Sequence, residues 1–289
     1  MRTLALLIAS LISGALLPAA DAKEVPQNLR DFYNAVRKKG SCSNQLATGF
    51  YATDTGPNTF SYCSDHLSTQ NVIYIQGKKG ALADMDIDCD GAQGGPADDG
   101  RCSIGRSPDY QGTTAFQDVV ASYAAGIKDL NSYVHPYVVF GNTGSRKGWR
   151  TFDPTRYGVR PLSVMAVVCD GGDKLFYGVW GDTNGDDGDF PMVGEVSLAL
   201  ATACNGDGMT GDNGYSRTDV LYLAFVGDEA VPGAKGANWT AVGFDDFERS
   251  IEGLGDKLVE GIVSAAARAD AVRWGLVWLA ALLAGFWAL

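Results

Sequence analysis

Short apolar runs separated by glycine and aspartate dominate the middle of the chain. They occupy residues 72–75, 81–87, 137–140, 164–169, 175–180 and 220–226. Runs of this length, rich in Val, Tyr and Phe and bounded by turn-forming residues, are typical of β-strands. The 37 glycines among the 289 residues suit tight turns between such strands better than they suit a helical bundle.

Helical periodicity interrupts this pattern at four places. Residues 28–39 carry apolar side chains at positions 29, 32, 33 and 36, end on basic residues and precede Gly40, which predicts a short amphipathic helix. Further helices are predicted within residues 115–130, from near Glu195 to near Cys204, and over residues 245–267. The resulting fold class is mainly β with peripheral helices (α+β), in a single domain.

Both ends of the chain carry processing signals. Residues 1–22 combine an early arginine, an apolar stretch over residues 4–17 and a small-x-small triplet, which predicts a secretory signal peptide cleaved before Lys23. Residues 265–289 combine a short polar spacer with an apolar tail. Small residues at 264–266 precede the spacer. Together these features predict a glycosylphosphatidylinositol (GPI) attachment signal with Ser264 as the attachment site. We expect a domain of residues 23–264 that is secreted, extracellular and GPI-anchored at the cell surface or cell wall.

Alternatives stay open for the C-terminal tail. The spacer is shorter than the usual length of about 8 to 12 residues, so Gly261 or a neighbouring alanine is another attachment site to consider. A single-pass membrane helix is the competing interpretation, but the apolar run is short against the roughly 20 residues needed to span a bilayer. No basic cytoplasmic segment follows it. We therefore expect contact with the membrane only through the GPI anchor.

Cysteine number and net charge restrict the kind of protein further. The six cysteines are Cys42, Cys63, Cys89, Cys102, Cys169 and Cys204. An even set in a secreted chain predicts three disulfides; pairing of sequence neighbours is the simplest connectivity, although sequence order does not decide geometry. With no CxxC motif and two histidines, a zinc site is not expected. The net charge of −11 would attract a polyamine and repel nucleic acid, and we expect a monomer with no nucleic-acid partner.

Two carboxyl groups stand out through their surroundings. Asp182 ends an apolar run next to Trp180, and Glu195 opens another apolar run thirteen residues later. A glycine-rich loop between them can bring them face to face, and two carboxyls in unlike environments can divide into an acid and a base. Most glycoside hydrolases use such a pair. The competing interpretation, two surface acids among the 34 of the chain, is the more frequent one on pattern alone.

Alternating aspartates form a second candidate site. They are Asp84, Asp86, Asp88 and Asp90, which on a strand would line one wall. We interpret them first as a binding site for an amine-bearing substrate and second as a solvated acidic face. Calcium ranks third: Asp86, Asp88 and Asp90 match the opening of a calcium loop, but its twelfth position is Ala97 instead of Glu. No other cofactor is expected.

Further candidates lie near the carboxyl pair or on a predicted loop. Tyr177 and Trp180 could stack on a ring-shaped substrate, although most aromatic residues of a β domain fill its core. Asn184 lies in the turn after Asp182 and is a candidate substrate-binding residue. Asn238 opens the sequon Asn-Trp-Thr, which predicts an exposed N-glycosylation site.

Motifs around the carboxyl pair carry a resemblance to a known family. They are Trp-Gly-Asp-Thr-Asn-Gly from Trp180, Gly-Glu at 194–195, and the segments 33–42, 60–63, 83–91 and 126–131. In this order, from roughly Tyr33 to Val259, the chain resembles the fungal endo-chitosanases of glycoside hydrolase family 75. In that family an Asp and a Glu in this context are the essential carboxylates of an inverting hydrolysis, and they correspond to Asp182 and Glu195. By analogy with other inverting hydrolases, we expect a closed barrel of the double-psi type.

The resemblance implies an endo-chitosanase that hydrolyses β-1,4 linkages between glucosamine residues with inversion. Its partners would be chitosan and glucosamine oligomers. We prefer Glu195 as general acid and Asp182 as general base, although a helix dipole at Glu195 would lower its pKa while burial would raise it. Two alternatives stay open: an inverting hydrolase of another cell-wall glycan, and a non-enzymatic, calcium-stabilised surface protein that binds the cell wall.

Overall fold

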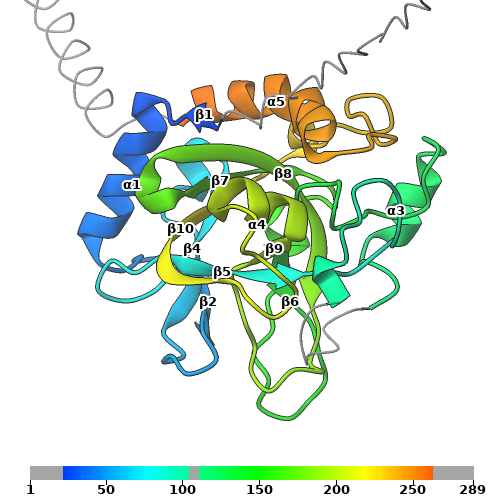
Figure 1. Ribbon diagram of the computed structural model, residues 1–289. Helices are drawn as coiled ribbons and strands as arrows, with labels where there is room; N and C mark the ends of the chain where they lie inside the picture. The colour runs from blue at the N-terminus through cyan, green and yellow to red at the C-terminus, as the bar shows by residue number, and fades with distance from the viewer. Residues whose placement is uncertain (1–21, 104–110, 263–289) are drawn as a thin grey trace, which may run out of the picture.

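The computed structural model describes residues 22–103 and 111–262 (Figure 1). The predicted signal peptide up to residue 21, the attachment site Ser264 and the tail of residues 265–289 lie outside these ranges. Within them, no helix combines the length and apolar character that crossing a membrane requires.

Six strands close into a barrel. They are β5 (Ala83–Asp88), β6 (Tyr137–Asn142), β7 (Val164–Cys169), β8 (Lys174–Asn184), β9 (Glu195–Ser197) and β10 (Tyr215–Phe225). Hydrogen bonds join them in the order β5, β9, β6, β8, β7, β10 and back to β5. The pairs β5–β9 and β6–β8 are parallel, and the other four pairs are antiparallel. The mainly β fold with a closed barrel is thus confirmed, while its double-psi topology stays a prediction.

The sheet continues beyond the barrel through the predicted strand at residues 72–75 and through three strands that the sequence pattern missed. β4 (Val72–Gln76) pairs with β10, β3 (Phe60–Cys63) with β4, and β2 (Gln45–Phe50) with β3. β1 (Lys23–Glu24) adds to β8 at the other edge. β2 was hard to predict because most of its residues are exposed or half-buried, which leaves little apolar alternation to detect.

Helices cover the outside of the barrel (Figure 1). They are α1 (Gln27–Lys39), α2 (Leu67–Gln70), α3 (Gln117–Ser122), α4 (Leu198–Asn205) and α5 (Phe244–Glu260), with short 3₁₀ turns at Arg101–Ser103, Pro154–Tyr157, Asp170–Gly172 and Asp228–Ala230. The predicted helix of residues 28–39 is α1, which buries Leu29, Phe32, Tyr33 and Val36. The helix predicted over 245–267 ends earlier, at Glu260.

Two boundaries differ from prediction where they matter for function. Glu195 lies in strand β9, and helix α4 begins three residues later, where the Ser197 hydroxyl accepts a hydrogen bond from the Leu200 N–H. The predicted effect of a helix dipole on Glu195 is therefore wrong. Strand β8 runs on through Asp182 to Asn184, so Asp182 is a strand residue held by a ladder and not the start of a loop.

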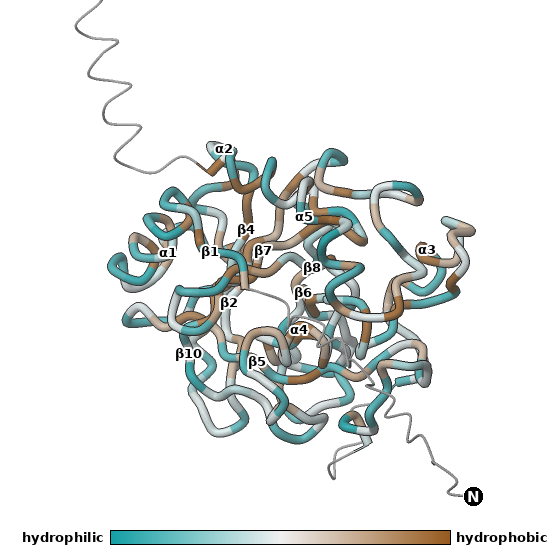
Figure 2. The backbone as a smooth tube through the Cα atoms, turned by 45° about the horizontal axis from the view of Figure 1, so that its top comes forward, coloured by the Kyte–Doolittle hydropathy of each residue, from teal (hydrophilic) through white to brown (hydrophobic). Residues whose placement is uncertain are grey.

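The barrel strands bury both faces. In β7, Met165, Val167 and Cys169 join one apolar cluster, while the alternate residues join a second cluster beneath α1 and α5. A strand that is buried on both faces has apolar residues at successive positions, which explains the continuous apolar sequence of residues 164–169. Figure 2 shows β4 and β7 largely in hydrophobic colours and the outer loops mostly in hydrophilic ones.

Three disulfides join sequence neighbours: Cys42 with Cys63, Cys89 with Cys102, and Cys169 with Cys204. This is the simplest of the connectivities considered from the sequence. The last two matter most here, because one follows the acidic strand β5 and the other ties β7 to α4. Each reduces the freedom of the unfolded chain and so stabilises the barrel.

Candidate active site

Hydrogen bonds hold one carboxyl oxygen of Asp182, on strand β8, and leave the other without a hydrogen-bond partner among the described residues. The residue is 5% exposed, and its Oδ1 accepts hydrogen bonds from the backbone N–H groups of Ala115 at 2.9 Å and Thr183 at 2.7 Å. The Trp180 indole N–H donates to the backbone carbonyl of Asp182 at 2.8 Å. Its Oδ2 is buried and has no hydrogen-bond partner among the described residues. A buried acceptor of this kind is costly unless a substrate, water or proton completes it.

Asp182 and Glu195 lie on the two strands that flank β6, at the same position along those strands. Val139 of β6 is the register partner of Asp182 on β8 and also of Glu195 on β9. Adjacent strands lie about 4.8 Å apart, so the two α-carbons are at most about 10 Å apart, and the curvature of the barrel brings them closer. The barrel thus brings together the two carboxyls that the sequence singled out.

A small cavity lies between these two carboxyls. Its volume is about 30 Å³, which is enough to hold a water molecule. It is lined by Asp88, Asp90, Gln111, Val139, Asp182, Thr183, Asn184, Gly185, Asp187 and Glu195. Five of these residues are acidic and none is basic, so the cavity can hold a water, a proton or a cation next to several carboxylates.

A larger cleft adjoins the small cavity. Its volume is about 650 Å³, and its lining is Asp54, Asp86, Ile87, Asp187, Gly188, Asp189, Phe190, Met192, Glu195, Gly211, Asp212, Asn213 and Gly214. Six of these residues are acidic and none is Lys or Arg. Glu195 and Asp187 line both spaces, so Glu195 lies where a ligand in the cleft would meet a water in the small cavity. The cleft favours a cationic ligand.

The alternating aspartates of β5 do not form one wall. Asp86 lines the cleft, and Asp88 and Asp90 line the small cavity. Asp84 is 1% exposed and lines neither space, because Gly194 packs over it: a Cβ on Gly194 would lie 2.7 Å from the Asp84 carboxyl oxygen. Burial and the nearby Asp86 raise the pKa of Asp84 to about 9. Asp84 is therefore a neutral core residue at neutral pH, and its predicted contact with a substrate is wrong.

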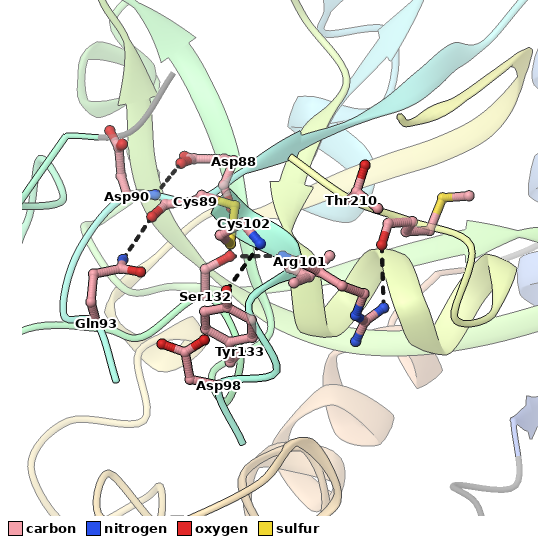
Figure 3. Close-up of a disulfide and its surroundings, with 12 residues drawn as sticks. Asp88, Cys89, Asp90, Gln93, Asp98, Arg101, Cys102, Ser132, Tyr133 and Thr210 are labelled. Carbon is pink, nitrogen blue, oxygen red and sulfur yellow. Dashed lines mark hydrogen bonds between the residues drawn. A yellow bond between two sulfur atoms is a disulfide. The ribbon is translucent and has the colours of Figure 1, made fainter. Parts of the chain in front are cut away.

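Hydrogen bonds and a disulfide fix the end of β5. Figure 3 shows Asp88 and Asp90 on either side of Cys89, which is bonded to Cys102. The Asp88 carboxylate accepts from the Asp90 N–H at 2.7 Å, and the Asp88 carbonyl accepts from the Ser132 hydroxyl at 2.5 Å. Both carboxyls are thereby held beside Asp182.

Burial controls the protonation of this cluster. It raises the pKa of Asp182 to about 7, against the two backbone N–H groups that lower it, and the nearby Asp90 and Asp129 raise it further. The pKa of Asp88 is raised well above its usual range by burial and then by Asp182 and Asp90. The cluster therefore carries protons near neutral pH that ordinary surface acids would not.

Three of these acids are close enough to share a cation. Carboxylate oxygens of Asp88, Asp90 and Asp182 lie within 4.8 Å of one another. Calcium–oxygen distances of about 2.3 to 2.6 Å would allow one ion to reach all three. Asp86, expected from the sequence as a ligand, is not part of the group, and Asp182 takes its place. The two functions compete, because a cation bound here would occupy Asp182.

The predicted aromatic contacts lie in the core. Trp180 is 2% exposed, packs edge-on against Phe116 and serves to hold Asp182. Tyr177 is fully buried and donates its hydroxyl hydrogen to Asp256 on α5. Neither ring is free to stack on a substrate, because Tyr177 packs in the core beneath α1 and α5 and Trp180 packs in the other apolar core. The prediction that either ring stacks on a substrate is therefore wrong.

Of the two predicted asparagines, Asn184 is the last residue of β8 and Asn238 lies in a loop. The Asn184 side chain lines the small cavity and donates to the Met192 carbonyl at 3.1 Å, which ties together the ends of the loop between Asp182 and Glu195. Asn238 is exposed, as a glycosylation site must be, and its N–H donates to the Ser250 hydroxyl. Its glycosylation stays a prediction.

Sequence reasoning missed several residues of the cleft. They are Asp54, Asp187, Asp189, Phe190 and Asp212. Asp54 and Asp212 come from loops far apart in the chain, and nothing in their surroundings marks them. Asp187, Asp189 and Phe190 lie between the two predicted carboxyls, and that position was the available signal.

An Asp and a Glu that line an acidic cleft in a closed barrel are compatible with the carboxylate pair that most glycoside hydrolases use. The family model for fungal chitosanases of glycosyl hydrolase group 75 matches residues 85–261, and the chain belongs to this family. It is 45% identical over 261 residues to an endo-chitosanase of Aspergillus oryzae (strain ATCC 42149 / RIB 40), covering 88% of this chain and 98% of the relative. Endo-chitosanase B of the same strain is 42% identical over 259 residues, and an endo-chitosanase of Aspergillus fumigatus is 42% identical over 257 residues, with the same coverage. The resemblance seen in the motifs is confirmed, and the protein is a glycoside hydrolase.

Proposed function

We propose that this protein is an endo-chitosanase that hydrolyses β-1,4 linkages between glucosamine residues with inversion. The observation that carries the proposal is the pairing of Asp182 and Glu195 with the same residue, Val139, across a cavity that can hold a water molecule and adjoins an acidic cleft. The names of its relatives and the excess of carboxylates in the cleft support a cationic glucosamine polymer as the substrate.

In this proposal Asp182 is the general base. Its Oδ2, buried beside the small cavity, takes a proton from a water molecule held there, and the water oxygen attacks the anomeric carbon. A base must be ionised, and a pKa of about 7 makes Asp182 a stronger base than an exposed aspartate. Its two backbone N–H donors keep the carboxylate oriented for that transfer.

Glu195 is the general acid of the proposal. It lines both the cleft and the small cavity, so it can reach the glycosidic oxygen of a bound chain. As the bond from the anomeric carbon to that oxygen breaks, Glu195 donates its proton to the leaving hydroxyl. Inversion requires carboxyl groups about 6.5 to 9.5 Å apart, which α-carbons at most about 10 Å apart allow.

The location of the enzyme is also part of the proposal. Three disulfides support passage through an oxidising secretory route. We propose that the mature protein is a monomer, glycosylated at Asn238 and held at the outer cell surface by a GPI anchor on Ser264. Release of the protein from intact cells by a phospholipase that cleaves GPI anchors tests this; protein that stays on the membrane contradicts it.

The activity is tested on soluble chitosan. A rapid fall in viscosity with few new reducing ends is expected from internal cleavage, and proton NMR at early times should show the α-anomer of the product. The β-anomer would contradict inversion. Cleavage of another wall glycan, but not of chitosan, would contradict the substrate. Binding to chitosan without cleavage would favour a wall-binding protein.

A further inference from the structure

An exposed aromatic ring lies within the acidic cleft. Phe190 is 39% exposed and lines the cleft with Asp187 and Asp189. Among residues 22–103 and 111–262, the other large hydrophobic side chain with comparable exposure is Val242, which does not line the cleft. Because it lines the cleft, this ring is open to contact by a ligand bound there.

Tyr51 supports the ring of Phe190. The two ring centroids lie 4.6 Å apart at an interplanar angle of 33°. The backbones are joined as well, because the Tyr51 N–H donates to the Pro191 carbonyl at 3.0 Å and the Val193 N–H donates to the Tyr51 carbonyl at 2.8 Å. The ring is thus packed on one side and linked to β-structure through its neighbours.

The loop that carries Phe190 is clamped at both ends. The Asp186 carboxylate accepts from the N–H groups of Ser145 at 2.6 Å and Arg146 at 2.8 Å. The Met192 carbonyl accepts from the side-chain amides of Asn142 at 2.8 Å and Asn184 at 3.1 Å. A ring held in place before the ligand arrives loses little conformational entropy on binding.

The surroundings of this ring match one kind of ligand. The substituents of a β-linked glucosamine unit are equatorial, so the faces of the sugar ring present C–H groups and the ammonium group projects from its edge. We propose that Phe190, backed by Tyr51, is the stacking platform of a glucosamine subsite in the cleft. Asp187 and Asp189 beside the ring would receive the ammonium group. This inference rests on the proposed function, because it assumes that the cleft binds glucosamine polymers.

The test compares three variants of Phe190 with a control, using a glucosamine hexamer as substrate. Phe190→Ala should raise KM about three- to tenfold, the loss expected for one aromatic stacking contact, and change kcat less than KM. Phe190→Leu should behave similarly, because leucine packs on Tyr51 but has no flat face. Phe190→Trp should keep KM close to the wild-type value. Val242→Ala, an exposed apolar residue outside the cleft, should change neither constant.

Two results would overturn the platform. One is a KM for Phe190→Leu equal to that of the wild type, which would mean that volume and not a flat ring is needed. The other is a loss of kcat and melting temperature in Phe190→Ala with unchanged KM, which would mean a structural role. If the wild type does not cleave the hexamer, the proposed function fails. Calorimetric titration of the hexamer then tests the platform alone, with weaker binding by Phe190→Ala expected and equal binding contradicting it.

Discussion

Two clusters of acids in this protein look alike by their proton affinities. One surrounds Asp182 at the cleft, and the other lies on α5 and contains Glu248, Glu252 and Asp256. Burial is the main cause in both of a carboxyl pKa of about 7, for Asp182 in the first and for Glu248 in the second. A perturbed pKa alone would therefore nominate both as functional sites.

The residues that surround the acids distinguish the two clusters. On α5, the Lys23 ammonium donates to Glu252 at 2.7 Å and to Asp256 at 2.5 Å, and the Tyr177 N–H donates to Glu248 at 3.2 Å. At the cleft, the residues lining both spaces include no Lys or Arg. Acids with a cation among them join parts of a fold, whereas acids that face a cavity without one are available to a cationic substrate. The absence of a neighbouring cation and the presence of a cavity are therefore better criteria for a functional site than a raised pKa.

The largest expected effect is the loss of turnover in Asp182→Asn and Glu195→Gln. Each should lower kcat for chitosan hydrolysis about 10²- to 10⁴-fold, the usual contribution of a general acid or base. Folding should survive in Asp182→Asn, because asparagine keeps an oxygen to accept from Ala115 and Thr183 and removes a buried charge. Reducing-end assays give kcat, and thermal melting reports on folding.

Glu248→Gln is the matched control. It removes a carboxyl of similar pKa from the cluster on α5, and glutamine still offers an oxygen to the Tyr177 N–H. We expect kcat to stay within about twofold of the wild type, since acid–base catalysis needs contact with the reacting atoms. A loss as large as that of Asp182→Asn, or near-normal turnover in Asp182→Asn, would refute the distinction between the clusters.

The pH dependence should separate stability from activity. Asp182 has a folded pKa raised from 3.8 to about 7, and Glu248 one raised from 4.5 to about 7. The folded state binds more protons at these two groups than the unfolded state between these values, so their contribution to stability is largest below about pH 4 and is lost as pH rises through about 7. Both Asp182→Asn and Glu248→Gln should flatten this fall in melting temperature.

The pH dependence of activity should follow the ionisation of Asp182 and not that of Glu248. If Asp182 must be ionised to act as the base, kcat/KM for a soluble glucosamine oligomer rises with pH up to about 7 in the wild type. Glu248→Gln should keep the same acid limb. An acid limb near pH 4 in the wild type, or one that moves in Glu248→Gln, would contradict the assignment of Asp182 as the base.

The same contrast shows what the sequence could and could not predict. Strands such as β7 were predictable because burial on both faces makes them continuously apolar, and Asp182 and Glu195 were marked by family motifs. β2 escaped detection because few of its residues are buried. The start of α4 was misjudged because the apolar run after Glu195 fits a strand or a helix equally well, and the three residues before Leu198 pair with β5 and β6.

Side-chain placement was less predictable than strand placement. Alternation put Asp84 and Asp86 on one face of β5, but Gly194 covers Asp84 and leaves Asp86 in the cleft. Tyr177 and Trp180 were near the carboxyl pair in sequence yet point into two different cores. Such outcomes depend on which neighbouring segment packs over a residue, and a local pattern carries no record of that.

The smallest expected effect concerns the cation of the cluster on α5. Lys23→Ala leaves Glu252 and Asp256 without their ammonium partner, but the three side chains are 30%, 39% and 41% exposed. Ion pairs this open to solvent contribute about 1 kcal/mol or less, equivalent to a fall of about 2 to 4 °C in melting temperature for a domain of this size. Scanning calorimetry measures it, with Lys38→Ala, an exposed lysine on α1, as the control.

Lys23→Ala also tests whether the two clusters are independent. β1 pairs Lys23 with Leu175 of β8, the strand that carries Asp182 seven residues further on. If the α5 cluster only fastens the edge of the sheet, kcat and the acid limb of the pH profile stay unchanged while the melting temperature falls. A changed acid limb would mean that β8 transmits strain or charge from α5 to Asp182, and the clusters would then have to be treated as one system.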